Sequence, residues 1–297
     1  MTLSPAQRSK IEDVLRRTYY AEQPPEKTDT EAAWADFEDH VRVRYEQALL
    51  HVVPWVERTA GLAGRRVVEL GSGTGSSTAA FAQHCERIHG YEICPVSTAA
   101  ARGRLDALEI RNAEVTVVDP STMLDTIGSN HPDGADAVLL YAVLEHMTFN
   151  ERLVVLEAAW KFLEPGGIIV VVETPNRLAY FDSHTSQLPF FGMLPPEIAV
   201  RYVDRSPRRQ LVDELRAADD KVLKLSRWGL GLSYHEFELA FDRPLRDVVV
   251  ADGYEEEIVA IYPVEKDEEL LREYFAECGV DVPVGFARSP LNFVVRK

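Results

Sequence analysis

Three glycines alternate with small polar residues at the end of an apolar run, in the segment Val67–Thr78 (VVELGSGTGSST). Glycine has no side chain and accepts positive φ angles, so a ligand can lie directly against the main-chain N–H groups of such a loop. The hydroxyl-rich residues that follow are typical of a helix N-terminus, which also favours bound polar groups. The segment therefore predicts a cofactor-binding loop between a strand and a helix.

The glycine spacing separates the classes of cofactor that use such a loop. A Walker phosphate loop places Lys and then Ser or Thr after its last glycine, whereas Gly75 is followed by Ser76 and Ser77. A dinucleotide loop reads G-x-G-x-x-G, and the position of its third glycine is occupied here by Ser76. A nucleoside triphosphate is therefore disfavoured, and a nicotinamide dinucleotide is an imperfect match.

Two acidic residues end the next two predicted strands. Glu92 closes RIHGYE, and Asp119 closes VTVVD. A carboxylate at the carboxyl end of a parallel strand can accept hydrogen bonds from both hydroxyls of a ribose. We therefore expect Glu92 to bind a ribose and Asp119 to accept from the exocyclic amine of an adenine.

With these residues the chain resembles the class I S-adenosylmethionine-dependent methyltransferases, specifically small-molecule members of types 11 and 12. ELGSGTG is similar to the first motif of that family, and Glu92 and Asp119 are similar to its ribose-side and adenine-side acids. DAVLLYAVLEHM is similar to the fourth strand and following helix, and LEPGGIIVVVETPN to the next turn and fifth strand. The resemblance covers about residues 62–178 and implies S-adenosylmethionine as the methyl donor.

The resemblance also implies roles for single residues of the cofactor site. Glu69 would orient the loop or meet the methionine amine. Gly71 and Gly73 would pass under the methionine and the ribose, and Tyr141 would present its carbonyl to the methionine end. The full set of predicted cofactor-binding residues is Glu69, Gly71, Ser72, Gly73, Gly75, Glu92, Ile93, Asp119, Pro120 and Tyr141.

Histidines after the fourth and fifth predicted strands are the candidates for a general base. A hydroxyl acceptor calls for a base within about 3 Å, and histidine is the first choice near neutral pH. His146 lies in LLYAVLEHM, and His184 lies in FDSHTS, where Asp182 and Thr185 can fix its tautomer. We predict His184 and His146 as catalytic residues. Magnesium held by Asp182, His184 and Glu173 is an alternative, but the preferred interpretation has no metal site.

The stretch from about residue 175 to 242 is rich in aromatic residues and has no clear strand. Such a composition predicts a folded insertion that walls a substrate pocket. Arginines cluster in it, and their forked side chains suit a carboxylate or phosphate, although a solvated helix turn is the simpler interpretation. The predicted substrate-binding residues are Asp182, Tyr180, His235, Arg208 and Arg209.

The elements that position these residues alternate between strand and helix patterns. The predicted strands are RRVVELG, RIHGYEI, EVTVVDP, DAVLLYAVLE, GGIIVVVETP, then either RDVVVADG or EEIVAIYPV, and finally LNFVVRK. We expect an α/β fold with a doubly wound, Rossmann-like, mostly parallel seven-stranded sheet. The resemblance implies that the last strand runs antiparallel to the rest.

The predicted domain organisation has two parts. Residues 1–61 form an N-terminal helical cap, whose last helix is expected from Thr30 to Glu57. This range follows from apolar residues that recur at three-to-four spacing. Residues 62–297 form the methyltransferase domain, with the helical lid inserted at about 175–242 after the fifth strand.

Composition limits the partners. Lys and Arg total 32 against 48 Asp and Glu, a net charge of −16, which disfavours nucleic acid. The chain has neither a signal-peptide pattern nor an apolar run long enough to span a membrane, so we expect a cytoplasmic protein without a membrane partner. Cys85, Cys94 and Cys278 are far apart, which predicts neither a disulfide framework nor a zinc site. A small-molecule acceptor is the expected partner, and a homodimer is left open.

The preferred interpretation is a methyltransferase that acts on a small molecule, at oxygen, by in-line displacement. Two alternatives remain: a protein that binds S-adenosylmethionine as a scaffold or partner subunit without catalysis, and an NAD-dependent oxidoreductase, which Ser76 disfavours. Nitrogen, carbon or a peptide carboxylate as acceptor also stays open, because the sequence does not reveal the acceptor.

Overall fold

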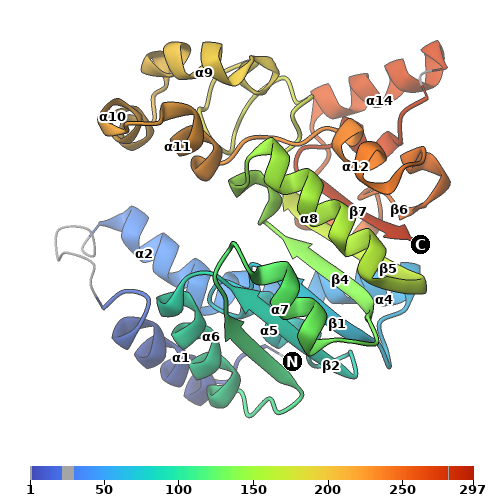
Figure 1. The fold of residues 1–297 in the computed structure, drawn as a ribbon. Coiled ribbons are helices and arrows are strands. Elements are labelled where there is room, and N and C mark those ends of the chain that lie inside the picture. Colours follow the sequence, from blue (N-terminus) through green and yellow to red (C-terminus); the bar gives the residue numbers. More distant parts are fainter. Residues whose placement is uncertain (1, 22–29, 280) are drawn as a thin grey trace. The chain divides into compact units, whose positions relative to one another are not determined.

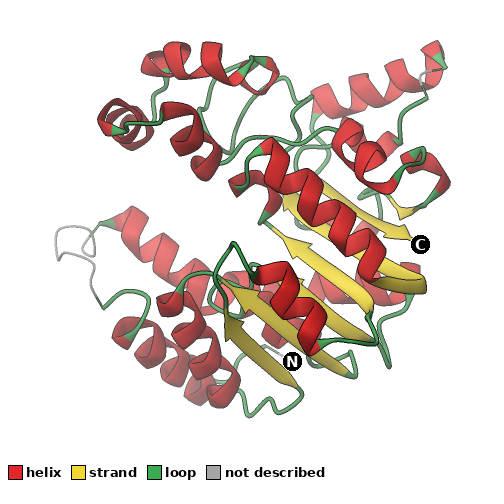
Figure 2. Cartoon of the chain, viewed as in Figure 1, coloured by secondary structure: helices red, strands yellow, loops and turns green. Residues whose placement is uncertain are grey.

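Seven strands alternate with helices in the computed structural model, which describes residues 2–21, 30–279 and 281–297 (Figures 1 and 2). The sheet order is β3-β2-β1-β4-β5-β7-β6. Strand β1 is parallel to β2 and β4, β2 is parallel to β3, and β7 is antiparallel to β6. The predicted fold class is therefore confirmed. The strands are β1 (Arg66–Leu70), β2 (Arg87–Glu92), β3 (Ala113–Val117), β4 (Ala135–Tyr141), β5 (Leu163–Thr174), β6 (Val249–Ala251) and β7 (Leu291–Arg296).

The strands form where short runs of apolar, often β-branched residues can be buried on both faces. In β5 the residues from Ile168 to Val172 are at most 1% exposed, and in β4 the run from Ala137 to Leu140 is equally buried. Such continuous runs are typical of strands covered by helices on both sides. The sequence suggests a turn at residues 164–167, whereas β5 already begins at Leu163. Gly166 within this segment has φ +81°, a conformation typical of turns.

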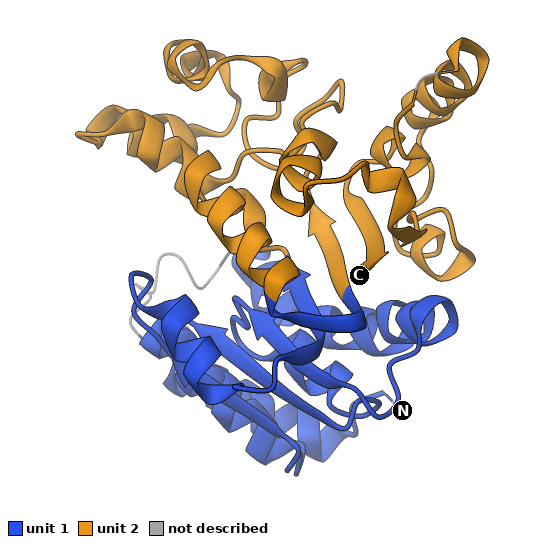
Figure 3. Ribbon diagram, turned by 45° about the vertical axis from the view of Figure 1, so that its right-hand side comes forward, with its two compact units in different colours: residues 1–141, 162–168 blue, residues 142–161, 169–297 orange. Residues whose placement is uncertain are grey.

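The chain forms two compact units (Figure 3). Unit 1 comprises Met1–Tyr141 and Phe162–Ile168, and unit 2 comprises Ala142–Lys161 and Ile169–Lys297. That residues 1–61 form a separate cap domain stays a prediction. Residues 22–29 of this range lie outside the described part of the chain. The units are described separately below.

Helices of unit 1 surround its strands and include an N-terminal helical layer. From Glu31 to Ala60 the helical backbone is continuous, with Thr30 as its N-cap, which confirms the predicted helix in this region. Buried residues of the first helices pack against Ala100 and Ala107 of the helix that follows β2. The helical segments are α1 (Pro5–Arg17), α2 (Glu31–Glu38), η2 (Asp39–Val43), α3 (Arg44–Gln47), η3 (Ala48–Val52), α4 (Val53–Ala60), α5 (Ser76–Phe81), α6 (Pro95–Ala107) and α7 (Met123–Asn130).

The predicted insertion folds around a small core of its own in unit 2. Phe191, Leu211, Leu215 and Leu225 are at most 1% exposed and belong to one hydrophobic cluster. The insertion begins with loop and turn residues up to Phe190 and is mainly helical from Phe191 onward. It is folded, as its aromatic composition predicts. The helical segments after β4 are η4 (Leu144–His146), α8 (Phe149–Phe162), η5 (Phe191–Met193), α9 (Pro196–Tyr202), η6 (Val203–Arg205), α10 (Arg209–Ala217), α11 (Lys221–Trp228), α12 (Tyr234–Phe241), η7 (Leu245–Asp247), α13 (Glu256–Val259), α14 (Lys266–Cys278) and η8 (Val284–Ala287).

The two alternatives for the sixth strand are resolved. β6 is Val249–Ala251, within RDVVVADG, whereas the second segment contains the helix α13 (Glu256–Val259). Glu255 is the N-cap of that helix, and acidic residues in a first turn interact favourably with the helix dipole. Acidic residues at a helix start therefore outweighed the β-branched run that follows them.

Two further observations concern the cysteines and membrane-spanning helices. The cysteines are free, with Cys85 buried, Cys94 half-buried and Cys278 exposed. Among the helices of the described residues, none combines the length and the apolar character needed to cross a membrane.

Candidate functional site

The glycine loop, Gly71–Gly75, joins the end of β1 to the start of α5 in unit 1. Gly71, Gly73 and Gly75 have φ angles of +72°, +52° and +79°, which L side chains rarely adopt. A Cβ on Gly75 would lie 2.9 Å from Ala101 Cα, whereas a Cβ on Gly73 would meet nothing within 4 Å. Gly75 is therefore required for packing against α6, and Gly73 presents bare backbone to open space.

Glu92 ties the end of β2 to the glycine loop. Its Oε2 accepts from the N–H of Gly73 at 2.8 Å, and its Oε1 accepts from the N–H of Cys94 at 2.8 Å. Each carboxylate oxygen has a second acceptor position, so the residue can still bind the two hydroxyls of a ribose. The adjoining Ile93 is 56% exposed, and it offers an apolar surface at the end of the same strand.

Glu69 is directed into the interior rather than toward a ligand. It is fully buried, and its two oxygens accept from the hydroxyls of Ser77 and Thr78 in the first turn of α5. Burial raises the pKa of this carboxyl to about 7, while the two hydroxyl donors oppose that rise. Of the two roles that the resemblance implies, these contacts support the one in which Glu69 orients the loop.

Residues beyond β3 and β4 complete the predicted cofactor set. Asp119 is exposed, and hydrogen bonds from the N–H and the hydroxyl of Ser121 to its Oδ1 lower its pKa. Pro120 follows it and is exposed as well, while Tyr141 is the half-buried last residue of β4. The predicted acids thus lie at the carboxyl ends of β2 and β3, where open α/β sheets bind ligands.

Two hydroxyls of the loop region support a ligand there. Ser72 Oγ and Ser76 Oγ are buried and have no hydrogen-bond partner among the described residues. A buried hydroxyl without a partner loses about 1–3 kcal/mol, so such groups in a cofactor loop indicate donors and acceptors reserved for a ligand. Together with the bare backbone of Gly73, they fit a cofactor that carries hydroxyls and other polar groups.

The N-terminal helices also reach the glycine loop, a feature that the sequence analysis missed. Arg104 of α6 is fully buried and donates to the carbonyls of Thr74, Val41 and His40. His40 Nδ1 lies 3.2 Å from Thr74 Oγ1. The guanidinium of Arg104 therefore links the glycine loop to the helical segment η2 (Asp39–Val43). The sequence contains no indication of this role, because Arg104 looks like any other arginine within a helix.

In unit 2 the structure brings Glu145, His146 and His184 together, which we call the histidine cluster. One ligand atom from each lies within 4.8 Å of the others, and the two imidazole centroids are 5.7 Å apart. Glu145 is 1% exposed, and its Oε1 lies 3.8 Å from His146 Nε2. The two predicted catalytic histidines are therefore neighbours, and Glu145 joins them.

Hydrogen bonds fix the tautomer of both imidazoles. His146 Nδ1 lies 3.0 Å from the carbonyl of Arg227, which can only accept, so Nδ1 carries the proton. His184 Nδ1 lies 2.9 Å from Thr185 Oγ1, whose own proton is donated to the carbonyl of Gly229. In both residues the lone pair is therefore on Nε2.

The pKa values of both histidines are lowered. Burial is the main cause for His184, whose pKa falls to about 4, and the neighbouring His146 adds to the effect. For His146 the cause is again desolvation, opposed by its bond to the Arg227 carbonyl. Both imidazoles are consequently neutral near pH 7.

Arginines hold the backbone of each member of the cluster. Arg152 donates to the carbonyl of Glu145 at 3.1 Å, and Arg227 donates to the carbonyl of His146 at 2.9 Å. Arg208 donates to the carbonyl of His184. Arg208, predicted as a substrate contact, thus has a structural bond that positions His184.

The other predicted substrate residues of unit 2 lie in different settings. Asp182 accepts from the N–H groups of Thr185 and Ser186, so Thr185 rather than Asp182 meets the His184 ring. His235 is exposed and stacks on the neighbouring Tyr234 ring, and Arg209 is exposed at the start of α10. Glu173, the third member of the alternative magnesium set, accepts from the hydroxyl of Tyr262.

Tyr180 is half-exposed and contributes to a separate hollow of unit 2. Its side chain, with Phe181, Glu265 and Leu270, lines a cavity of about 480 Å³ near the start of α14. Charged and polar side chains, among them Lys266 and Asp267, line the rest of this cavity.

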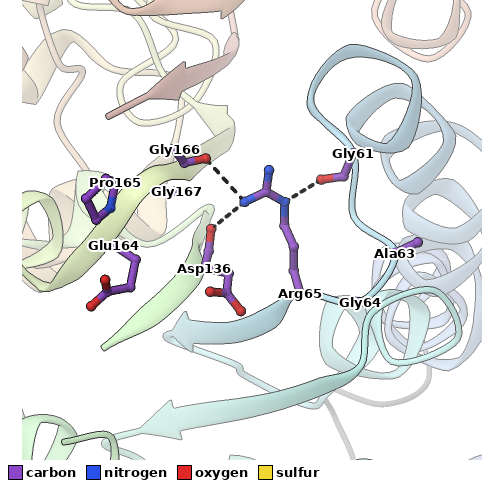
Figure 4. A pocket seen from close by; sticks show the side chains of 9 residues that line it. All are labelled: Gly61, Ala63, Gly64, Arg65, Asp136, Glu164, Pro165, Gly166 and Gly167. Atoms are coloured by element: carbon purple, nitrogen blue, oxygen red, sulfur yellow. Dashed lines mark hydrogen bonds between the residues drawn. The ribbon is translucent and has the colours of Figure 1, made fainter. Parts of the chain in front are cut away.

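A pocket in unit 1 lies away from the predicted cofactor residues. It has a volume of about 280 Å³ and surrounds Arg65, at the amino ends of β1 and β4 (Figure 4). Arg65 donates to the carbonyls of Gly61 and Asp136 at 2.6 and 2.9 Å. The glycine loop lies at the opposite, carboxyl ends of the strands, so this pocket is a structural junction of the sheet.

Comparisons with known proteins concern the domain that carries the glycine loop. Residues 68–169 match the family model of a methyltransferase domain. A ubiquinone biosynthesis O-methyltransferase from Cupriavidus pinatubonensis is 32% identical over 124 residues, which cover 41% of this chain and 46% of that protein. A second, from Paracidovorax citrulli, is 29% identical over 163 residues, covering 54% and 66%. The matched part thus spans about half to two thirds of these relatives.

Solved structures of methyltransferases are similar as well. One is an S-adenosylmethionine-dependent methyltransferase from Clostridium acetobutylicum, with 12% identity, coverage of 52% of this chain and 61% of the other, and a TM-score of 0.41. The family match, the strand order and the glycine loop together confirm the predicted class. Residues 68–169 match a methyltransferase domain, as the resemblance predicts for this part of the chain.

Proposed function

We propose that this chain transfers a methyl group from S-adenosylmethionine to an oxygen of a small molecule. The observation that carries the proposal is the bond from Gly73 N–H to Glu92, at the carboxyl ends of β1 and β2. That bond lies within the residues that match the methyltransferase family model. The names of the two relatives, which are O-methyltransferases, support oxygen as the acceptor atom.

The residues of unit 1 have the role of holding the donor. Glu92 accepts from the ribose hydroxyls, Asp119 faces the adenine amine, and the Gly73 backbone lies along the methionine and ribose. Bound S-adenosylmethionine supplies a methyl group on a cationic sulfur, which keeps the bonding electron pair and leaves as S-adenosylhomocysteine. The loop therefore needs no phosphate-binding groups, in keeping with Ser76 at the position of a third glycine.

The residues of unit 2 have the role of activating the acceptor. The proton of the acceptor hydroxyl passes to an imidazole Nε2 as the new O–CH₃ bond forms, and His184, whose Nδ1–H is held by Thr185, is the proposed base. Removing a base of this kind slows the reaction by about 10²–10⁴-fold. A carboxylate acceptor would need no base, so His184 also distinguishes the two kinds of oxygen.

The proposal is tested by measuring S-adenosylhomocysteine formed from S-adenosylmethionine with a panel of hydroxylated aromatic, quinol and sugar compounds. We expect turnover with at least one hydroxyl acceptor, and a fall in kcat of about 10²–10⁴-fold in His184→Ala without a change in S-adenosylhomocysteine affinity. Binding without turnover on any acceptor would favour the scaffold alternative, and binding of NAD in place of S-adenosylhomocysteine would favour the oxidoreductase.

A further inference from the structure

The histidine cluster combines donor atoms that suit a metal ion. Two imidazole nitrogens and one carboxylate oxygen lie within 4.8 Å of one another. A metal ion bound at about 2.0–2.2 Å to each donor sets the donors roughly 3–4 Å apart. Side-chain movements of about an ångström or less would therefore close the set around an ion.

The tautomers leave the Nε2 lone pair of both imidazoles available to a ligand. Each Nδ1–H is engaged, by the carbonyl of Arg227 in His146 and by Thr185 in His184, so each Nε2 is a bare acceptor. Among the described residues neither Nε2 has a hydrogen bond, and Glu145 adds negative charge 3.8 Å from His146 Nε2. Metal-binding histidines are held in this way, with the second ring nitrogen donating to a carbonyl, hydroxyl or carboxylate.

Arginines hold the backbone of the histidine cluster. Arg152 and Arg227 hold the carbonyls of Glu145 and His146, and each is itself paired with a carboxylate, Glu236 and Glu151 respectively. Arg208 holds the carbonyl of His184 and adds a positive charge on that side. A cation would therefore depend on the carboxylate of Glu145 within the set itself.

We propose that Glu145, His146 and His184 bind a divalent ion of the borderline transition-metal class, such as Zn²⁺, Co²⁺ or Mn²⁺. Two imidazoles and one carboxylate are a ligand set that these ions accept, whereas magnesium prefers oxygen ligands. Three protein ligands leave a coordination position open for an oxygen of the acceptor.

The catalytic consequence rests on the proposed methyl transfer to oxygen, and in the metal-loaded protein His184 acts as a ligand in place of the base described above. A hydroxyl that binds the ion loses its proton to solvent more readily, because the cation stabilises the alkoxide or phenolate. That oxygen then forms its bond to the methyl carbon as the carbon–sulfur bond breaks, and the electron pair remains on sulfur. In the metal-loaded protein, the ion rather than a free imidazole activates the acceptor.

The ligand set also differs from the magnesium alternative raised by the sequence. In that alternative Asp182 and Glu173 bind the ion together with His184. In the structure Asp182 accepts from backbone N–H groups, and Glu173 accepts from the hydroxyl of Tyr262. The residues that lie beside His184 are instead Glu145 and His146.

Titration of the chelator-treated full chain with Co²⁺, in the absence of S-adenosylmethionine, tests the proposal. Visible ligand-field absorption reports coordination of Co²⁺, and elemental analysis after desalting reports how much is retained. We expect saturable binding by the natural chain at about one ion per chain. His146→Ala and His184→Ala should each weaken it by at least about 10–100-fold, the range known for changes around such ligands.

A conservative change and a matched control keep the test independent of misfolding. Thr185→Val preserves size but removes the acceptor of the His184 Nδ1 proton, and it should weaken Co²⁺ binding by about 10–100-fold. His84→Ala removes an exposed histidine of unit 1 and should leave Co²⁺ binding unchanged. Circular dichroism establishes that each variant is folded.

The outcomes separate this proposal from the proposed function. Absence of saturable Co²⁺ absorption in the natural chain, or equal binding by the folded His146→Ala, His184→Ala double variant, would overturn the metal site. Calorimetric binding of S-adenosylhomocysteine by the same samples is measured in parallel. If that binding fails while Co²⁺ still binds, the metal site stands and the proposed function falls.

Discussion

In the glycine loop, two carboxylates hold main-chain and hydroxyl donors and one arginine, Arg104, holds a carbonyl, whereas in the histidine cluster an arginine holds the carbonyl of every member. Glu92 accepts from the Gly73 N–H, and Glu69 accepts from hydroxyls at the start of α5. Arg152 and Arg227 instead donate to the carbonyls of Glu145 and His146. The first arrangement exposes N–H groups and bare backbone to a ligand, and the second exposes side chains with lone pairs.

The contrast follows the chemistry proposed for each region. A donor such as S-adenosylmethionine is gripped through its ribose and its amino-acid end, which main chain and one carboxylate can do. Activation of an acceptor needs lone pairs at fixed positions, and those come from side chains whose backbone is immobilised. Five substitutions in three sets test this comparison, and the sets follow the largest loss of stability expected within each.

The largest effect is expected from Arg152→Met, because this buried guanidinium serves several partners in unit 2. It donates to the carbonyls of Leu144 and Leu230 and pairs with Glu236 at 3.0 Å. Removing one partner of a buried ion pair costs about 3–5 kcal/mol. Urea unfolding of the full chain should therefore show a loss of that size.

Arg104→Met is the matched change in unit 1. Arg104 is just as buried and donates to three carbonyls, and burial lowers its pKa to about 10. No carboxylate is recorded among its partners in the described chain, so its loss strands no charge and should cost less, about 1–3 kcal/mol. Equal losses of stability for the two variants would contradict the contrast between the regions.

A pair of glycine changes is expected to separate packing from ligand contact in the loop. Gly75→Ala puts a Cβ 2.9 Å from the Ala101 backbone at positive φ, and it should destabilise the chain by about 2–4 kcal/mol. Gly73→Ala meets open space, so only the positive φ is unfavourable, at about 1 kcal/mol. Thermal unfolding measures both.

The two glycine substitutions should differ in their effect on cofactor affinity as well as on stability. Gly73→Ala should weaken S-adenosylhomocysteine affinity out of proportion to its small effect on unfolding, since its Cβ would occupy the ligand's position. Affinity equal to that of the natural chain would show that Gly73 faces no ligand.

Glu69 should make stability depend on pH. Its folded pKa of about 7 lies above the ordinary value of 4.5, so the folded chain binds this proton more tightly than the unfolded chain. The contribution of the neutral form is complete below about pH 4.5 and is lost as pH rises through 7, with an order of magnitude of 2–3 kcal/mol. Glu69→Gln, which cannot ionise, should flatten the unfolding free energy over that interval.

The control for this prediction is Glu86, an exposed acid just before β2. Glu86→Gln should leave the slope between pH 4.5 and 7 as it is in the natural chain. A slope unaltered by Glu69→Gln would mean that folding does not raise the pKa of this carboxyl.

The sequence predicted the parts of the structure that depend on local pattern. Strands β1 to β5 are confirmed because apolar runs and their glycine or proline boundaries are local signals. The predicted acid Glu92 does lie against the loop, because carboxyl ends of neighbouring parallel strands share one edge of a sheet. The sequence left two candidate segments for the sixth strand, because the three residues of β6 are too few to show a periodic pattern.

The sequence could not predict the contacts that join distant segments. Glu145 stands beside His146 in the chain, yet its place in the cluster depends on His184, which lies in another segment. Arg152 and Arg104 look like ordinary charged helix residues, and only the fold shows that they are buried. Asp182, chosen as the neighbour of His184, instead accepts from turn N–H groups, a local preference of aspartate.

Calorimetric titration of S-adenosylhomocysteine into the natural chain and into Glu92→Ala tests the central claim most directly. We expect saturable binding by the natural chain and a loss of about 1–3 kcal/mol in the variant, because the ribose hydroxyls lose a charged acceptor. Undiminished binding by folded Glu92→Ala, or no binding by the natural chain, would contradict the account.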